Sequence, residues 1–200
     1  MNQLFKSNSS ASSLHIRKTD LSLDLTQLRD VVWQPVNQFH LNQIELDWLS
    51  DSDSLTRKLQ KIAAGFHVML LTDGWQLSSA ENHVEADANR QVLLCDAQLP
   101  LVLGLTEVNQ RALKQESALC NWFEKPLGEL LFPENRARSR IFEIADFTQS
   151  SYLMDWLAKW YTNEVPAQLW GRRCEIAYHS AVLRLTEIFL PNHPLYGVSL

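Results

Sequence analysis

The feature of this chain that most constrains its fold is an alternating run near the C-terminus. Two segments of β-strand composition flank the short polar pair His179 and Ser180, which predicts a β-hairpin. Successive side chains of a strand point to opposite faces, so one row of the second segment contains Leu183, Leu185, Glu187 and Phe189. A carboxylate in an apolar row is costly to bury unless it meets a partner or a ligand. Glu187 is therefore a candidate site residue, and a structural ion pair or a water-facing edge position would also account for it.

The composition indicates one globular domain in a reducing compartment. The chain has 200 residues, enough for a substantial core, and 46% of them are hydrophobic. Its cysteines are odd in number and have no metal-ligand spacing, which favours free thiols at Cys95, Cys120 and Cys174. The N-terminal residues lack the apolar core of a signal peptide, and no apolar run reaches transmembrane length. We therefore expect a cytoplasmic protein without stable membrane insertion.

Charge and motif content exclude several classes of function. The formal net charge of −5 argues against a nucleic-acid-binding surface, and it requires that an anionic ligand be held by a few local cations. The histidines show no paired ligand spacing, so no metal site is expected. The sequence also lacks the nucleophilic-serine and phosphate-loop motifs.

Helix and strand signals are spread along the rest of the chain. Asp53 or Ser54 can cap a helix whose apolar positions recur at helical spacing, at Leu55, Leu59 and Ile62. Strand patterns cover residues 66–71, 75–77, 90–95 and 99–103. Helical patterns cover residues 107–123, with Thr106 as the cap, and residues 151–162.

The balance of these elements predicts the fold class. The strands outnumber what a βαβ alternation needs, and tight turns join several of them. We therefore expect an α+β fold with a mainly antiparallel sheet and helices packed on it. Residues 1–25 include a low-complexity Ser/Asn-rich stretch and are expected to form a flexible N-terminal extension, which leaves a single domain at residues 26–200.

A series of motifs runs in a recognisable order through residues 26–196. Leu-Trp-Gly-Arg-Arg at 169–173 is followed by Leu-Thr-Glu-Ile-Phe-Leu-Pro at 185–191 and Pro-Leu-Tyr at 194–196. Shorter matches precede it: Thr-Gln-Leu-Arg at 26–29, Leu-Asp-Trp-Leu at 46–49, Ser-Leu-Thr at 54–56, Arg-Gln-Val-Leu-Leu-Cys at 90–95 and Lys-Pro-Leu-Gly at 125–128. Together these motifs resemble the bacterial chorismate lyase family.

The resemblance implies both a fold and an activity. The family fold is an antiparallel sheet of about six strands, with helix-turn-helix flaps that close over a buried ligand. Its members remove pyruvate from chorismate to give 4-hydroxybenzoate for ubiquinone synthesis. Because the ring becomes aromatic, the reaction is downhill, and we expect no cofactor. The expected protein is a monomer whose partners are chorismate and 4-hydroxybenzoate.

The resemblance also implies a role for four residues. Arg90 would grip the ring carboxylate with its fork of donors. Glu187 would face the ring hydroxyl, either accepting its hydrogen bond or assisting removal of the adjacent ring proton. Leu55 and Leu127 would contact the ligand largely through the main chain, although leucine at such positions is ordinarily a core residue.

Two observations from the residues themselves bear on these roles. Arg90 opens a strand in which Val92 and Leu94 share its face, so its guanidinium is expected to reach into the core. A surface arginine at a strand start is the alternative. Arg172 and Arg173 are candidate partners for the second carboxylate of chorismate, but neighbouring strand residues face opposite ways, so at most one of them can point inward.

Some features depart from the family pattern. Leu105 stands where the family has arginine, and Asn109 stands where it has proline. The connection between Ile144 and Leu169 is longer than usual and carries a tryptophan-rich stripe. That stripe predicts either an extra helix on the core or an exposed patch for a partner or membrane surface. Two other functions stay open: a non-catalytic sensor domain for aromatic acids, and an inactive relative that only binds them.

Overall fold

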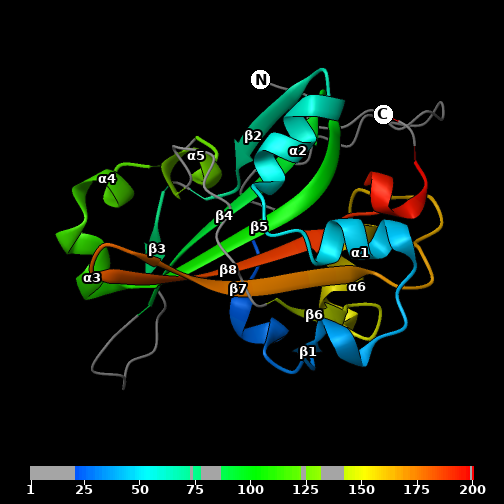
Figure 1. The fold of residues 1–200 in the computed structure, drawn as a ribbon, viewed down its shortest axis with the longest axis horizontal. Coiled ribbons are helices and arrows are strands. Elements are labelled where there is room, and N and C mark those ends of the chain that lie inside the picture. Colours follow the sequence, from blue (N-terminus) through cyan, green and yellow to red (C-terminus); the bar gives the residue numbers. More distant parts are fainter. Residues whose placement is uncertain (1–20, 73, 78–86, 123–124, 132–141, 199) are drawn as a thin grey trace.

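A single antiparallel sheet organises the molecule. The computed structural model describes residues 21–72, 74–77, 87–122, 125–131, 142–198 and 200. Within them the strands run in the order β1-β6-β7-β8-β5-β4-β2, with β3 also paired to β4 (Figure 1). Their bounds are Gln34–Pro35 (β1), Phe66–Leu70 (β2), Gln76–Leu77 (β3), Asp87–Asp96 (β4), Leu99–Asn109 (β5), Glu143–Asp146 (β6), Trp170–Tyr178 (β7) and Ala181–Phe189 (β8). The predicted α+β class is confirmed. The sheet has eight strands, and β1 and β3 are only two residues long.

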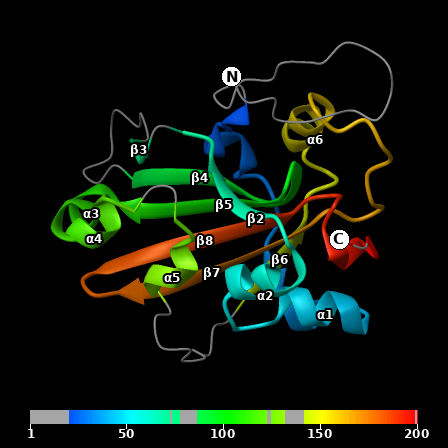
Figure 2. The ribbon, with the colours of Figure 1, turned by 90° about the horizontal axis from the view of Figure 1, so that it is seen from above.

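Helices lie on both faces of this sheet. The α-helices are Gln43–Leu49 (α1), Leu55–Ile62 (α2), Gln110–Gln115 (α3), Ser117–Cys120 (α4), Leu127–Leu131 (α5) and Ser151–Ala158 (α6). Short 3-10 helices lie at Leu25–Leu28 (η2), Val36–Gln38 (η3) and Pro194–Tyr196 (η4). Figure 2 shows α1, α2 and α5 on one side of the sheet, and η2 with α6 on the other.

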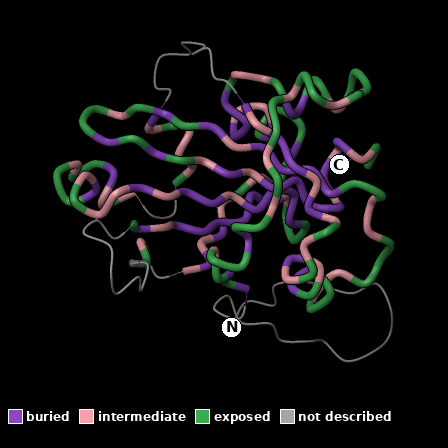
Figure 3. Tube along the Cα trace, turned by 90° about the horizontal axis from the view of Figure 1, so that it is seen from below, coloured by how far each residue is buried: buried purple, intermediate pink, exposed green. Residues whose placement is uncertain are grey.

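The sheet divides the core into layers (Figure 3), because its strands are buried on both faces. One cluster joins Leu93, Leu103 and Ile188 to α6 and the residues around Leu21. A second joins Val92, Leu94 and Phe189 to α1 and α2. A third fills the end of the sheet near α3, α4 and α5. The central strands β4 and β5 therefore have two largely buried faces, and polar residues on them need partners.

The predicted C-terminal hairpin is present. β7 and β8 pair from Gly171 with Ile188 to Tyr178 with Ala181, and the turn is the predicted pair His179-Ser180. His179 has a φ of 51°, in the left-handed region that tight hairpin turns require. The helix predicted after Ser54 is also present as α2, with the Ser54 hydroxyl accepting from the Arg57 N–H.

The helix predicted at residues 107–123 is partly wrong. β5 continues to Asn109, so Thr106 is a strand residue and does not cap a helix. The pairing of β5 with both β4 and β8 extends through Val108, and these ladder hydrogen bonds outweigh the local helical pattern. The helix starts one turn later, as α3, where the Asn109 side chain accepts from the N–H groups of Arg111 and Ala112.

The last residues of the extension predicted at 1–25 pack on the domain. Leu21 and Leu23 are buried against the sheet, and the Gln91 side chain exchanges hydrogen bonds with both main-chain groups of Leu23. Residues 21–25 are therefore packed on the domain. The rest of the predicted extension, residues 1–20, lies outside the described residues.

The tryptophan-rich segment forms α6, as predicted. Leu153, Trp156 and Leu157 are buried, and the Trp156 indole donates to the carbonyl oxygen of Leu21 at 2.7 Å. The first of the two interpretations, a helix packed on the core, is thus the one the structure supports for this stripe.

Candidate active site

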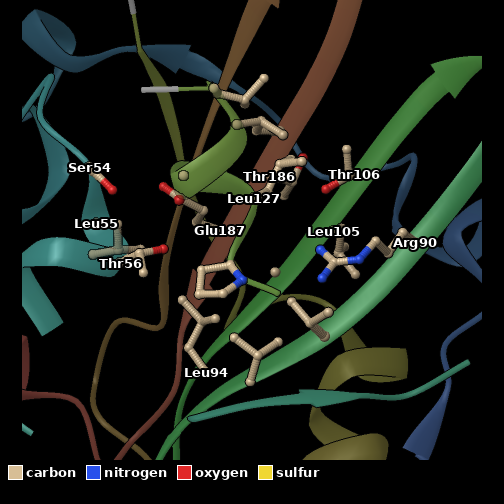
Figure 4. A pocket seen from close by; sticks show the side chains of 17 residues that line it. Ser54, Leu55, Thr56, Arg90, Leu94, Leu105, Thr106, Leu127, Thr186 and Glu187 are labelled. Atoms are coloured by element: carbon tan, nitrogen blue, oxygen red, sulfur yellow. The ribbon is translucent and has the colours of Figure 1, made fainter. Parts of the chain in front are cut away.

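A pocket lies between helices α2 and α5 and the face of the sheet that these helices cover. Its floor is formed by β4, β5 and β8, and its lid by residues 54–56 and 126–128 (Figure 4). It holds about 570 Å³ not filled by atoms, part of it at the open mouth. All four residues predicted for the site line it: Leu55, Arg90, Leu127 and Glu187.

Strand register explains why Arg90 and Glu187 both face this pocket. Arg90 of β4 pairs with Thr106 of β5, and Thr106 pairs with Leu185 of β8. Glu187 is two residues further along β8, so it points to the same face as Leu185 and Arg90. Gly104 lies between Val92 and Glu187 in the next row, and its lack of a side chain leaves the floor of the pocket open.

Arg90 reaches into the pocket from a buried position. Its side chain is 2% exposed, and one terminal nitrogen donates to the carbonyl oxygen of Lys125 at 2.9 Å. This contact ties β4 to the segment that leads into α5. Burial lowers the pKa of Arg90 to about 10, so the guanidinium remains charged at neutral pH. The surface position considered from the sequence is therefore wrong.

The Glu187 side chain extends from β8 into the pocket, and Arg172, which does not line the pocket, pairs with its carboxylate. The Nε of Arg172 on β7 lies 2.6 Å from the Oε2 of Glu187, across the β7–β8 ladder. The structural ion pair considered for Glu187 is thus present, and the same carboxylate also lines the pocket. Arg172 itself does not line it, so it does not take the expected place beside a second ligand carboxylate. Arg173 points to the opposite face and pairs with Glu143 at 2.8 Å.

Polar groups of α2 complete the wall that faces Glu187. Ser54 and Thr56 are each 7% exposed, and Figure 4 shows their hydroxyl oxygens turned toward the carboxylate. Ser54, Leu55 and Thr56, at the N-terminal end of α2, line the pocket, and the N–H groups in the first turn of a helix favour an anion. A Cβ at Gly128 would lie 2.6 Å from the Ser54 hydroxyl oxygen. Glycine at this position therefore allows α5 to approach α2 closely.

Sequence reasoning missed several polar residues of the pocket. The sequence shows Thr56 only as part of a motif, and the helical pattern predicts Thr106 as a cap. Thr186 alternates with Glu187 along β8, and it borders both this pocket and a second cavity on the other face of the sheet. Polar side chains at buried strand positions were the available signal, but their neighbours come from distant parts of the chain.

Comparison with known proteins identifies the family. The sequence profile described as chorismate lyase matches residues 27–198. The chain belongs to the chorismate lyase family. It is 33% identical over 148 residues to a probable chorismate pyruvate-lyase of Shewanella sp. (strain MR-7), covering 72% of this chain and 78% of that protein. It is 34% identical over 161 residues to a probable chorismate pyruvate-lyase of Psychromonas ingrahamii, covering 76% and 84%.

A third relative carries the name without a qualifier. The chain is 30% identical over 165 residues to the chorismate pyruvate-lyase of Enterobacter sp. (strain 638), covering 78% of this chain and 88% of the relative. These relatives match most of the chain.

Leu105, the first departure from the family pattern, lies on β5 between two residues of the pocket face, so its side chain points to the opposite face of the sheet. Leu105 borders the pocket, but it is 5% exposed and packs in the cluster that contains Leu103 and Ile188. Asn109, the second departure, serves as the cap of α3. Both substitutions therefore have a structural role in this member of the chorismate lyase family.

The described residues show neither a membrane-spanning helix nor a cluster of metal ligands. Among these residues, no helix combines the length and apolar character needed to span a bilayer. Nor do they contain a cluster of three histidine, cysteine or acidic side chains arranged to hold a metal ion.

Proposed function

We propose that this protein is a chorismate pyruvate-lyase that releases 4-hydroxybenzoate. The observation that carries the proposal is the convergence of Arg90 and Glu187 on one pocket. A guanidinium binds a carboxylate with paired hydrogen bonds. A carboxylate accepts a hydrogen bond from a hydroxyl. Chorismate carries a carboxylate and a hydroxyl at opposite ends of its ring, so one ligand can meet both groups.

In the proposed reaction, the ring loses the proton on the carbon that bears the hydroxyl. The bond between the neighbouring ring carbon and the ether oxygen breaks, and its electron pair leaves with the enol form of pyruvate. The ring becomes aromatic, and the hydroxyl remains as the phenol of 4-hydroxybenzoate. Arg90 would hold the ring carboxylate, and Glu187 would orient the hydroxyl and stand next to the proton that departs.

The second carboxylate of chorismate needs a separate partner. The enolpyruvyl ether is on the ring carbon next to the hydroxyl, so it lies close to whatever binds that hydroxyl. The hydroxyls of Ser54 and Thr56, at the start of α2, line the wall that faces Glu187. We assign the enolpyruvyl carboxylate to this helix end, where the peptide dipoles favour an anion.

The deciding experiment is incubation of the purified protein with chorismate. We expect 4-hydroxybenzoate and pyruvate in equal amounts, measured by chromatography and a coupled pyruvate assay. The variant Arg173→Met serves as a matched control, because Arg173 lies on the opposite face of the sheet. Absence of product at high enzyme concentration would contradict the proposal. Tight binding of 4-hydroxybenzoate without turnover would instead indicate a binding protein.

A further inference from the structure

A second buried arginine lies behind the proposed catalytic carboxylate. Arg172 is 1% exposed, and its guanidinium makes three polar contacts. Its Nε pairs with the Oε2 of Glu187 at 2.6 Å. One terminal nitrogen donates to the carbonyl oxygens of Trp48 at 2.7 Å and of Asp51 at 2.9 Å. The guanidinium also lies 4.5 Å from the ring centroid of Phe142.

These contacts join two walls of the pocket. Trp48 lies near the end of α1, and Asp51 lies in the connection that leads to Ser54 and α2. That connection presents Ser54 and Thr56 to the pocket, whereas Glu187 belongs to the floor. Because a guanidinium is planar and rigid, contacts with both segments fix their relative position.

The pairing also leaves the two carboxylate oxygens of Glu187 in different surroundings. Arg172 occupies Oε2, while no side chain or main-chain group in the described part of the chain donates to Oε1. Glu187 lines the pocket, so Oε1 is the oxygen available to a ligand there. An arginine that holds one oxygen in place limits rotation of the carboxylate about its last bond.

We propose that Arg172 is a positioning residue for the lyase reaction. It holds Glu187 so that Oε1 meets the ring hydroxyl, and it holds the α1–α2 connection at the matching distance. This inference rests on the proposed function. Arg172 does not touch the ligand, and it acts through Glu187 and through the carbonyl groups of Trp48 and Asp51.

A double-mutant cycle tests this relation. The single variants Arg172→Met and Glu187→Gln are compared with the double variant, and turnover of chorismate is measured at saturating substrate for each. We expect Arg172→Met to lower turnover about a hundredfold in the wild-type background, because misplacing a reacting group by an ångström has an effect of that order. In the Glu187→Gln background, the same change should cost clearly less, because only the contribution through the α1–α2 connection remains. Equal losses in the two backgrounds would overturn the proposal, because Arg172 would then not act through Glu187.

A second variant covers the case in which Arg172→Met does not fold. Arg172→Lys keeps the positive charge but has one donor group instead of a fork. We expect it to fold, as judged by thermal melting, and to keep the affinity for 4-hydroxybenzoate within about threefold. Its turnover should still fall by about tenfold or more. Full turnover in Arg172→Lys would overturn the proposal.

The control is the neighbouring Arg173→Met, which removes an arginine from the other face and should leave turnover unchanged. The failure of this inference can be distinguished from the failure of the proposed function. If the wild-type protein releases no pyruvate from chorismate, the proposed function fails. If the wild-type protein is active and the cycle is additive, only the role of Arg172 fails.

Discussion

Arg90 and Glu187 lie on strands that do not touch each other, yet their side chains share one pocket. β5 separates β4 from β8, and the register of the two pairings places both residues on the same face. The chain thus brings a cation and an anion to opposite ends of a cavity without pairing them. Arg90 donates to the Lys125 carbonyl, and Glu187 pairs with Arg172.

The variant Arg90→Ala should lose affinity for both chorismate and 4-hydroxybenzoate. Each ligand carries the ring carboxylate, and removal of one partner of a buried, charge-assisted pair costs about 2–5 kcal/mol. Titration of the intrinsic tryptophan fluorescence measures both dissociation constants. Arg90→Lys is the control, since it keeps the charge without the fork and should lose less. Unchanged affinity for 4-hydroxybenzoate in Arg90→Ala would show that Arg90 is not the carboxylate partner.

The variant Thr56→Val should weaken binding of the substrate, chorismate, but not of the product, 4-hydroxybenzoate. The change preserves shape and removes the hydroxyl proposed to bind the enolpyruvyl carboxylate. Since 4-hydroxybenzoate lacks that group, its affinity should stay the same. The KM for chorismate should rise by about 10-fold, which corresponds to a hydrogen bond to a charged group. Equal effects on both ligands would place the enolpyruvyl carboxylate elsewhere.

The variant Glu187→Gln should reduce turnover far more than binding. Glutamine keeps a hydrogen-bonding oxygen but cannot serve as a base, and general base catalysis contributes about 100-fold or more. We expect a turnover loss of that size and less than about a tenfold loss in affinity for 4-hydroxybenzoate. The variant should also melt at a lower temperature, because buried Arg172 loses its anionic partner. Nearly full turnover would leave Glu187 only an orienting role.

Replacing Trp156 and Trp160 by alanine should destabilise the protein. Trp156 is 2% exposed and donates to the Leu21 carbonyl, and its ring packs edge-on against Trp160 at 5.2 Å. Loss of a buried tryptophan side chain costs about 3–5 kcal/mol. Chemical denaturation measures the change, and Asp155→Ala on the exposed side of the same helix is the control, expected within about 0.5 kcal/mol of wild type. Normal stability combined with reduced sedimentation with membranes would favour a docking patch.

Stability should fall at mildly acidic pH because of His193. This side chain is fully buried between the rings of Trp48 and Phe189, and its Nδ1 accepts from the Leu195 N–H. Burial, followed by the nearby charges of Arg172 and Lys58, holds the pKa of His193 well below its usual 6.5. The unfolded chain therefore binds a proton below that pH while the folded chain does not, so stability decreases as the pH falls.

The expected contribution of His193 is about 1.4 kcal/mol per pH unit, once the pH is below the pKa of the unfolded histidine. His193→Asn keeps an oxygen that can accept from Leu195 and removes the titrating group, so its stability should vary less between about pH 6 and pH 5. His40→Asn, at an exposed position, should keep the wild-type dependence. An identical pH dependence in His193→Asn and wild type would exclude this origin.

The sequence by itself determined those features that depend on near neighbours. The alternation in residues 181–189 put Glu187 in an apolar row, and the spacing after Ser54 predicted α2 with its cap. The pattern Arg90, Val92, Leu94 also predicted an inward guanidinium. Each of these follows from the period of a strand or the geometry of a helix end, which a few consecutive residues define.

The tertiary structure alone decided which of these groups become partners. Arg172 donates to Trp48 across 124 positions of sequence, and the alternation rule only stated that one of Arg172 and Arg173 points inward. The continuation of β5 through Val108 depended on strands on both of its sides. The packing of Leu21 depended on Trp156 of α6, and that of Leu23 on Gln91. Such contacts satisfy buried polar groups and fill the core only after distant segments have packed together, so local periodicity does not predict them.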